Sequence, residues 1–333
     1  MDTAFVILVF VVILGLAFDY VNGFHDTANA IATVVATRVL SPLQAVLMAA
    51  TMNFIGALSG TAVASTVGKG IIEPGSVTQQ LVISALLSAI AWDLLTWYYG
   101  IPSSSSHALV FSIVGAGIAT GGVSVLGWEG IQKVLAGLVV SPTLGFVGAF
   151  LVMVMLMHLF FRAHPAVVTK VFGRAQLVSS LYMAFSHGGN DAQKTMGVIT
   201  MALAAYYGWS GDKWEVPLWV IVAAATAMGL GTASGGWRII KTMGTRIVEL
   251  KPIHGFAAET TAATVIELAS RVGVPISTTH VISSSIMGVG STGARRAVHW
   301  GVAGNIVTAW IVTIPACIGM GWLFSTALHA LIP

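Results

Sequence analysis

Two aspartates stand in polar motifs that recur in the two halves of this hydrophobic chain. Asp26 lies in NGFHDTAN at residues 22–29, and Asp191 lies in HGGNDAQK at residues 187–194. An ionised carboxylate among apolar residues is costly unless it has a partner or a function. One Asn/Asp-Gly break would be an ordinary turn at a membrane surface, but its recurrence in both halves favours a site at which the carboxylates bind a cation.

Amide side chains accompany the two carboxylates. Asn22 and Asn29 flank Asp26, and Asn190 directly precedes Asp191. Carboxylate and amide oxygens are hard ligands that suit Na⁺, and a carboxylate can equally carry a proton. Glycines beside both motifs predict unwound backbone whose free carbonyls add further ligands. We therefore expect Asp26, Asp191, Asn22 and Asn29 to bind a coupling cation.

Two clusters of hydroxyl side chains follow prolines, in GIPSSSSH at residues 100–107 and GVPISTTH at residues 273–280. Proline followed by hydroxyls at the cap and first turn predicts a helix start. Free N–H groups and a partial positive charge at such a terminus attract anions. Ordinary Ser/Thr packing between membrane helices is the alternative, but the repetition favours an oxyanion site. Its expected residues are Ser104, Ser105, Ser106, Ser277, Thr278 and Thr279, joined by Asn190 and Lys194.

Several other ionisable residues fall in apolar or repeated contexts. His107 and His280 close the hydroxyl clusters, where each could relay a proton or serve as a satisfied structural histidine. Glu259 lies in GFAAETTAATV, which favours a coupling role. Asp93 and Glu267 precede the hydroxyl clusters at roughly matched positions, where either a coupling or a structural role is open. His25 and His187 border the aspartate motifs with the same ambiguity.

Lys194 occupies the position that Asn29 occupies in the first motif. An ammonium beside Asp191 can take the place of a bound monovalent cation. We hypothesise that Lys194 neutralises Asp191, lowers the number of Na⁺ ions required and shifts coupling toward protons. The alternative is a purely structural Lys–Asp pair.

The composition defines the class of protein that must position these residues. The chain has 333 residues, of which 56% are hydrophobic and 8% are charged, and its mean hydropathy is +0.89. Soluble domains carry roughly 25% charged residues, so the chain is predicted to be a polytopic membrane protein. The net charge of +3 therefore does not indicate nucleic-acid binding, and the lone Cys317 excludes a disulfide within the chain.

Hydrophobic stretches divide the chain into about ten elements, five in each half. An odd number in each half predicts that the second repeat enters the membrane from the opposite face, so the repeats are inverted. We expect the first element of each half to be a helix broken at its aspartate motif. Elements 80–99 and 104–124, with their partners in the second half, could be re-entrant hairpins or full spans. The predicted elements are 4–37, 43–66, 80–99, 104–124, 133–160, 175–209, 216–237, 255–270, 275–292 and 298–331.

The basic residues suggest an orientation. The predicted division is a first membrane repeat at 1–160, a basic cytoplasmic linker at 161–176 and a second membrane repeat at 177–333. With the N-terminus outside, ten Lys or Arg residues, among them Arg295 and Arg296, fall in inner loops and four fall in outer loops. Both termini are therefore expected on the outer face.

The four motifs together resemble the inorganic phosphate transporter (Pit) family, and in particular its bacterial low-affinity branch. The family signature G-x-N-D-x-[AGS]-[NQK] is similar to Gly188–Lys194 and, with His25 in place of Asn, to Gly23–Asn29. The signature G-[IL]-P-x-S-[ST]-[ST]-H is similar to the segments around Pro102 and Pro275. The resemblance covers essentially the whole chain.

This resemblance implies an inverted-repeat transporter, often dimeric, that moves inorganic phosphate with Na⁺ or H⁺. Asp26, Asn190 and Asp191 match the family's cation and phosphate positions, and the two hydroxyl clusters match its hydroxyl motif. The expected protein is a symporter of the bacterial inner (plasma) membrane, without cofactor, fixed metal or nucleic-acid partner. Some relatives carry neutral metal–phosphate complexes, and a sulfate permease on the same scaffold is the alternative.

Two other classes fit the residues less well. An intramembrane hydrolase would need one activated serine with its base, whereas the hydroxyls here form symmetric runs. A channel would not need matched broken helices with buried carboxylates. We therefore expect a transporter and not an enzyme.

Overall fold

Long apolar runs form helices in this chain because a bilayer interior offers no water to satisfy backbone N–H and C=O groups. The computed structural model describes residues 2–209, 211–293 and 297–331. Within this described part the regular structure is helical, and the only β contacts are two isolated bridges. The prediction of an all-α fold is confirmed. Arg295 and Arg296, which contributed to the predicted charge bias, lie outside the described residues.

The helices of the first half correspond closely to the predicted elements. Within the described residues, five helical stretches are long and apolar enough to cross a membrane, and seven are if each bent helix pair counts as one span. The helices are α1 (Thr3–His25), α2 (Thr27–Ala36), α3 (Pro42–Ala57), α4 (Ala62–Gly70), α5 (Gln79–Tyr99), α6 (Ser105–Gly121) and α7 (Trp128–Leu159).

The second half repeats this order, with one continuous helix in place of α1 and α2. The short helix after α9, which is the counterpart of α4, is followed directly by a π-helical turn at Thr242–Arg246. The helices are α8 (Pro165–Tyr207), α9 (Leu218–Ser234), α10 (Trp237–Lys241), α11 (Pro252–Arg271), α12 (Thr278–Gly290) and α13 (Trp300–Leu331).

Local details recur between the halves. The α3–α4 pair bends by 69° and the α9–α10 pair, with its π turn, bends by 61°. The long helices α7 and α13 each contain one proline, Pro142 and Pro315, which are 173 residues apart. One isolated bridge joins Ile72 to Leu126, and its counterpart joins Val248 to Val298. Two copies of one helical unit therefore form the bundle.

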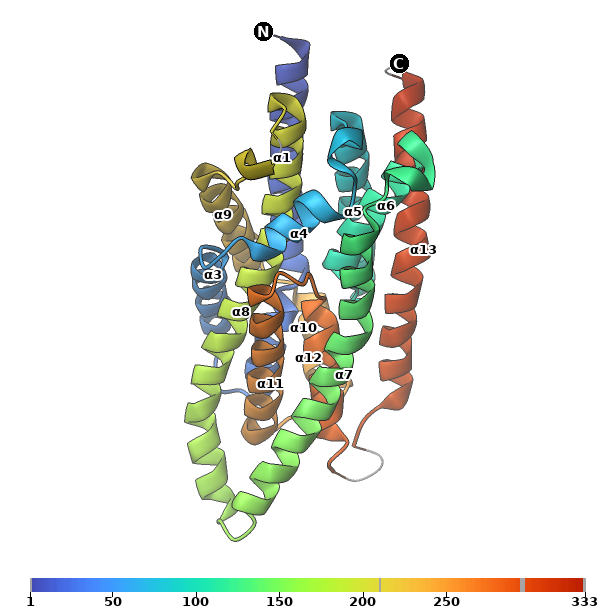
Figure 1. Ribbon diagram of the computed structural model, residues 1–333. Helices are drawn as coiled ribbons and strands as arrows, with labels where there is room; N and C mark the ends of the chain where they lie inside the picture. Colours follow the sequence, from blue (N-terminus) through green and yellow to red (C-terminus); the bar gives the residue numbers. More distant parts are fainter. Residues whose placement is uncertain (1, 210, 294–296, 332–333) are drawn as a thin grey trace.

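The two copies have opposite orientations. Both termini lie at the same end of the bundle, where hairpin α5–α6 also begins, whereas hairpin α11–α12 occupies the other end (Figure 1). The 13 residues of α12 span about 20 Å, which is too short for a hydrocarbon core of about 30 Å. The hairpin tips meet inside the molecule, where the rings of His107 and His280 are 4.6 Å apart. Helix α12 is thus too short to span the membrane by itself, whereas α5 and α6 are long enough by length and composition, and the inverted arrangement of the repeats is confirmed.

The helix packing locks each repeat to the other. Helix α6 packs against α13, and α12 packs against α7. Glycines allow these close approaches, since a Cβ added at Gly115 would lie 2.1 Å from the Ile318 carbonyl oxygen. A Cβ at Gly288 would lie 2.2 Å from the Phe146 carbonyl oxygen. Each hairpin is therefore held by the long helix of the opposite repeat.

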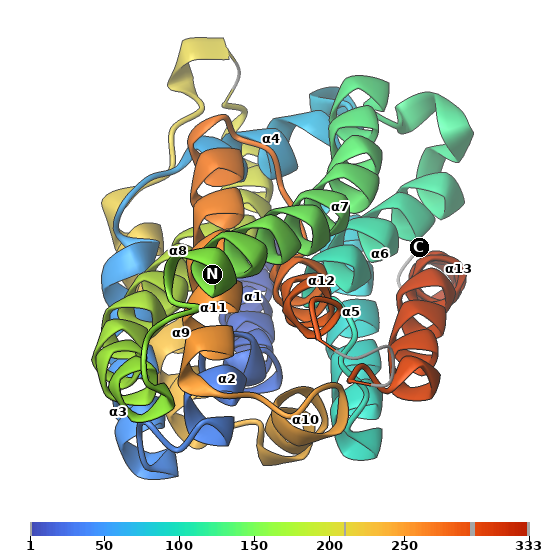
Figure 2. The same cartoon turned by 90° about the horizontal axis from the view of Figure 1, so that it is seen from below.

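Two apolar cores flank the hairpin tips. The first includes the outer part of α1 with α4, α5, α6 and α9, and the second includes α2, α3, α10, α11 and α12. Viewed along the bundle, α1, α11, α12 and α5 lie between α3 and α8 on one side and α6 and α13 on the other (Figure 2). Phe18 belongs to the first core and Ile31 to the second, so Asp26 lies between them on the same span.

The predicted break in the first element of the second half is not observed. Helix α8 runs without interruption through His187–Asp191, and it begins at Pro165 inside the predicted linker. Gly188 and Gly189 instead allow α3 to approach, because a Cβ at Gly188 would lie 2.2 Å from the Asn53 carbonyl oxygen. In the first element of the first half, the break predicted at 22–26 consists of one residue between α1 and α2, Asp26, with φ −94° and ψ 5°.

The cross-repeat contact can be tested with Gly288→Ala. We expect this change to lower the free energy of unfolding by about 1–3 kcal/mol, the usual cost of overpacking. Alanine favours a helix over glycine by about 1 kcal/mol, so destabilisation would reverse the intrinsic preference. Gly304→Ala on α13 is the matched control, since its Cβ would meet no atom within 4 Å. Thermal unfolding of the purified variants is the measurement, and equal midpoints would contradict the packing role.

Candidate functional site

The starts of α6 and α12 have the same capping geometry. Ser104 accepts the N–H of His107 at 3.2 Å, and Ser277 accepts the N–H of His280 at 3.2 Å. Each serine caps its helix from an extended backbone conformation, as Ser at an N-cap usually does. The remaining first-turn N–H groups and hydroxyls of both helices therefore face the region between the hairpin tips.

Lys194 of α8 connects the two hairpin tips. Its ammonium donates to the Ser106 hydroxyl at 2.5 Å and to the Ile276 carbonyl oxygen at 2.9 Å, and it forms an ion pair with Asp191. The side chain is almost completely buried. One cation thus contacts the start of α6, the segment before α12 and a carboxylate on its own helix.

Asp191 receives further polar contacts. Thr278 donates to Asp191 Oδ2 at 3.0 Å, and His187 Nε2 lies 3.1 Å from the same oxygen. The other nitrogen of His187 lies 3.1 Å from Asn53 Oδ1 on α3. Buried charges are tolerated when they are paired and hydrogen-bonded, and Asp191 meets both conditions.

Asp26 lies across from Asp191 at the break between α1 and α2. His25 Nδ1 is 2.6 Å from Asp26 Oδ1, and Thr279 donates to Asp26 Oδ2 at 3.4 Å. Asn29 donates to Thr278 at 3.2 Å and to Thr279 at 2.9 Å. The first turn of α12 therefore contacts both aspartates.

Three buried side chains of this cluster could hold a cation together. Asp26, His187 and Asp191 each offer one ligand atom, and these atoms all lie within 4.8 Å of one another. With both aspartates ionised, Lys194 charged and the histidines neutral, the cluster carries one negative charge. One more monovalent cation or proton would make it neutral.

The two histidines of the hydroxyl motifs lie together in an apolar setting. The His107 and His280 rings are 4.6 Å apart, and His280 stacks on Trp310 at 3.9 Å. Both ring nitrogens of His280 are buried without a hydrogen-bond partner among the described residues. The structure thus brings the predicted relay residues together, and their role as a relay stays a prediction.

Some predicted site residues lie away from this cluster. Glu259 accepts hydrogen bonds from Thr33 at 2.6 Å, Gln176 at 2.8 Å and Ser179 at 2.5 Å, in a separate buried network. Asn190 donates to Ser270 at 2.8 Å on α11. The Asn22 side chain is buried, and its Oδ1 has no partner among the described residues.

Sequence reasoning assigned no role to Thr96 or Asp19, and it noted Ser103 only as part of the first hydroxyl cluster. Thr96 lies 3.0 Å from His25 Nε2, and Ser103 donates to Thr96 at 2.8 Å. Asp19 is fully buried on α1 and accepts from Thr195 at 2.9 Å. The signal that could have identified Asp19 is the presence of an acidic residue in an apolar run about two helical turns before Asp26.

Comparison with known proteins identifies the family. A family model described as "Phosphate transporter family" matches residues 22–321, a range that contains both aspartate motifs and both hairpins. The chain belongs to the phosphate transporter family. Since the members are transporters, the expectation that this phosphate transporter family member is not an enzyme is confirmed.

Individual relatives of this family member match along nearly their whole length. A Rhizobium meliloti (strain 1021) protein described as "Probable low-affinity inorganic phosphate transporter" is 49% identical over 314 residues, covering 94% of each chain. A Bacillus subtilis (strain 168) protein with the same description is 46% identical over 326 residues, covering 96% of this chain and 97% of the relative. The sequence resemblance to the low-affinity branch is thereby confirmed.

A solved structure supports the same fold for this family member. The protein is described as "The sodium-dependent phosphate transporter", and its TM-score is 0.89 at 28% identity. The match covers 98% of this chain and 100% of that chain. The phosphate transporter family member described here is therefore a multi-pass helical membrane protein.

The Lys194–Asp191 pair predicts a large effect on stability. Asp191→Asn should lower the free energy of unfolding by about 3–5 kcal/mol, because it leaves a buried ammonium without its counter-charge. The double variant Asp191→Asn/Lys194→Met should lose less than the single variant. Thermal unfolding of purified protein is the measurement.

Glu267→Gln is the matched control, since it removes a carboxylate from a partly exposed i,i+4 pair with Arg271. A change within about 1 kcal/mol is expected there. Similar losses for Asp191→Asn and Glu267→Gln would show that burial of the Lys194 pair is unimportant for stability.

Proposed function

We propose that this protein is a secondary active symporter that takes up inorganic phosphate together with protons. The observation that carries the proposal is the convergence of two matched helix starts, Lys194 and two aspartates between inverted repeats. Membership of the phosphate transporter family supports phosphate as the substrate. The proposed phosphate ligands are Ser104, Ser105, Ser106, Ser277, Thr278, Thr279 and Lys194. Asn190 could join them only if its amide left Ser270, to which it donates in this conformation.

Hydroxyls and helix termini suit a tetrahedral oxyanion. The starts of α6 and α12 offer N–H groups, partial positive charge and hydroxyl donors without fixed charge. Lys194 adds one full positive charge between them. Phosphate at neutral pH can also donate a hydrogen bond, which a nearby carboxylate such as Asp26 can accept and which sulfate cannot offer.

Charge balance gives the reason for coupling. The cluster carries about one net negative charge before an anion arrives, so phosphate binding requires added positive charge. A proton or Na⁺ near Asp26 and Asp191 would supply it. A relative described as sodium-dependent supports Na⁺ as the alternative, whereas Lys194 in the position of Asn29 favours protons.

Inverted repeats supply the means of transport. We propose that the repeats at 1–160 and 177–333, joined through 161–176, alternate in exposing the site between the hairpin tips to each face. In this proposal both termini lie on the outer face of a bacterial inner membrane, and two copies can associate as a homodimer. A metal–phosphate complex as cargo is an alternative form of the same substrate.

Uptake of ³²P-phosphate into proteoliposomes tests the proposal. A pH gradient that is acidic on the side of entry should drive accumulation, and excess unlabelled sulfate should not compete. Asp191→Asn should reduce uptake at least about tenfold, a loss of about 1.4 kcal/mol of transition-state stabilisation. Accumulation driven only by Na⁺ would overturn proton coupling, and competition by sulfate would overturn the substrate assignment.

The role of Lys194 can be tested with Lys194→Asn, which copies Asn29 of the first motif. Without the ammonium, a monovalent cation should be needed beside Asp191, so phosphate uptake should become stimulated by Na⁺ about tenfold. Glu267→Gln should respond to Na⁺ as the unmodified protein does. Uptake by Lys194→Asn that remains driven by the pH gradient and indifferent to Na⁺ would contradict the substitution of Lys194 for a cation.

A further inference from the structure

Asp93 is a buried carboxylate that forms no ion pair among the described residues, and the donor that faces it is the Ser105 hydroxyl of α6. Asp93 lies on α5 of the first hairpin, and none of its surface is exposed. Neither carboxylate oxygen has a hydrogen-bond partner among the described residues, and no Lys, Arg or His there forms an ion pair with it. Asp93 is neither among the proposed phosphate ligands nor among the residues proposed to bind the cation.

The other acidic residues of the interior are different in this respect. Asp191 contacts Lys194 and Thr278, Asp26 contacts His25 and Thr279, and Glu259 accepts three hydrogen bonds. An ionised carboxylate that receives no donor in a dry interior costs several kcal/mol. Such a group avoids the cost by holding a proton. A proton held on Asp93 would avoid this cost.

We propose that Asp93 is the residue that binds the co-transported proton. The inference rests on the proposed phosphate symport and names the group that couples it. Water supplies the proton to a carboxylate oxygen of Asp93 on one side of the membrane, and the same O–H bond breaks to return the proton to water on the other side. No other bond changes.

The charges that face Asp93 explain why proton and phosphate would bind together. His25 and Asp26 act on it from α1, Asp191 from α8, and Cys317 lies near it on α13. From α6 the nearby polar group is the Ser105 hydroxyl, which lies 3.4 Å from His25 Nδ1. A positive charge on His25 would favour an ionised Asp93, whereas Asp26 and Asp191 disfavour a third negative charge, and a phosphate at the start of α6 would disfavour it further. By linkage, a bound proton would raise the affinity for phosphate by the same factor.

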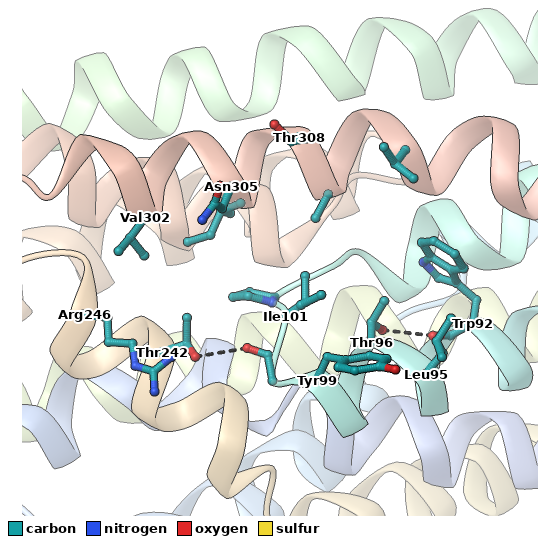
Figure 3. A pocket seen from close by; sticks show the side chains of 15 residues that line it. Trp92, Leu95, Thr96, Tyr99, Ile101, Thr242, Arg246, Val302, Asn305 and Thr308 are labelled. Atoms are coloured by element: carbon teal, nitrogen blue, oxygen red, sulfur yellow. Dashed lines mark hydrogen bonds between the residues drawn. The ribbon is translucent and has the colours of Figure 1, made fainter.

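A cavity lies within one helical turn of Asp93 along α5. The cavity, of about 490 Å³, lies between α5 and α13 and is lined by Trp92, Thr96, Pro102 and Asn305 among others. Figure 3 shows Trp92 and Thr96 across the cavity from Asn305 and Thr308. Thr96 lines this cavity, and its hydroxyl lies 3.0 Å from His25 Nε2 of the central cluster. Movement of the α5–α6 hairpin would therefore change the access of water to Asp93.

The test separates net proton-coupled transport from exchange. In proteoliposomes, Asp93→Asn should lose at least about tenfold of pH-gradient-driven phosphate accumulation and of phosphate-induced proton uptake. It should keep exchange of internal for external phosphate at equal pH within about threefold, because exchange needs no release of the proton. Asp93→Glu should restore part of the proton uptake. Glu267→Gln, at the roughly matched position of the second repeat, is the control and should behave as the unmodified protein.

Three results would overturn the inference. The first is that Asp93→Asn keeps normal proton-to-phosphate coupling. The second is that a correctly folded Asp93→Asn loses exchange as well as accumulation. The third is that the unmodified protein takes up phosphate with Na⁺ and without proton movement. Absence of phosphate exchange in the unmodified protein would instead overturn the proposed function.

Should Asp93→Asn fail to fold, the unmodified protein can be treated with dicyclohexylcarbodiimide, which modifies protonated carboxyls in apolar surroundings. Peptide mass spectrometry should then find the adduct on Asp93, and an unmodified Asp93 would count against the proposal.

Discussion

The buried ion pair between Lys194 and Asp191 is the interaction on which the centre of this protein depends. The ammonium reaches from α8 to the Ser106 hydroxyl of one hairpin and to the Ile276 carbonyl oxygen of the other. A buried charge pair is a poor source of net stability but a strong determinant of position, because either charge alone would be costly. The pair therefore sets where both hairpin tips lie relative to α8. Any conformational change that separates the tips has to rearrange the contacts of this one side chain.

Close packing between the repeats supports that arrangement from outside. The hairpin helices α6 and α12 lie against the long helices of the opposite repeat through Gly115 and Gly288. Small residues at such contacts are the usual means of helix association in membranes, where lipid removes most of the hydrophobic driving force. Neither hairpin can shift without moving along a helix of the other repeat. The same contacts that hold the site closed can thus transmit a change from one face to the other.

The electrostatics of the interior are divided among carboxylates in different surroundings. Asp26 and Asp191 receive donors and lie beside His25 and Lys194 respectively, whereas Asp93 receives no donor within hydrogen-bond geometry among the described residues. This division suits a symporter, since one set of carboxylates can remain charged to balance a cation while another gains and loses a proton. Glu259 forms a third environment, in which three donors hold an acidic side chain between α2, α8 and α11. The three environments differ although the backbone of the two repeats is matched, because the side chains around each carboxylate differ.

The sequence by itself determined the class, the duplication and most of the central residues. Repeated Asp and Pro-Ser/Thr motifs in a chain with 8% charged residues left few alternatives to an inverted-repeat membrane protein, and the hydroxyl residues capped helices as their types require. Only the tertiary structure decided what the glycines and isolated acidic residues do. Gly188 and Gly189 allow a close helix contact and do not break α8, because a missing Cβ serves either purpose and only the neighbour distinguishes them. Likewise, Asp93 and Glu267 looked alike in sequence, but Asp93 is buried with no hydrogen bond found among the described residues, and Glu267 is paired with Arg271 near the surface. The sequence could not distinguish them, since the burial of a side chain depends on helices far away in the chain.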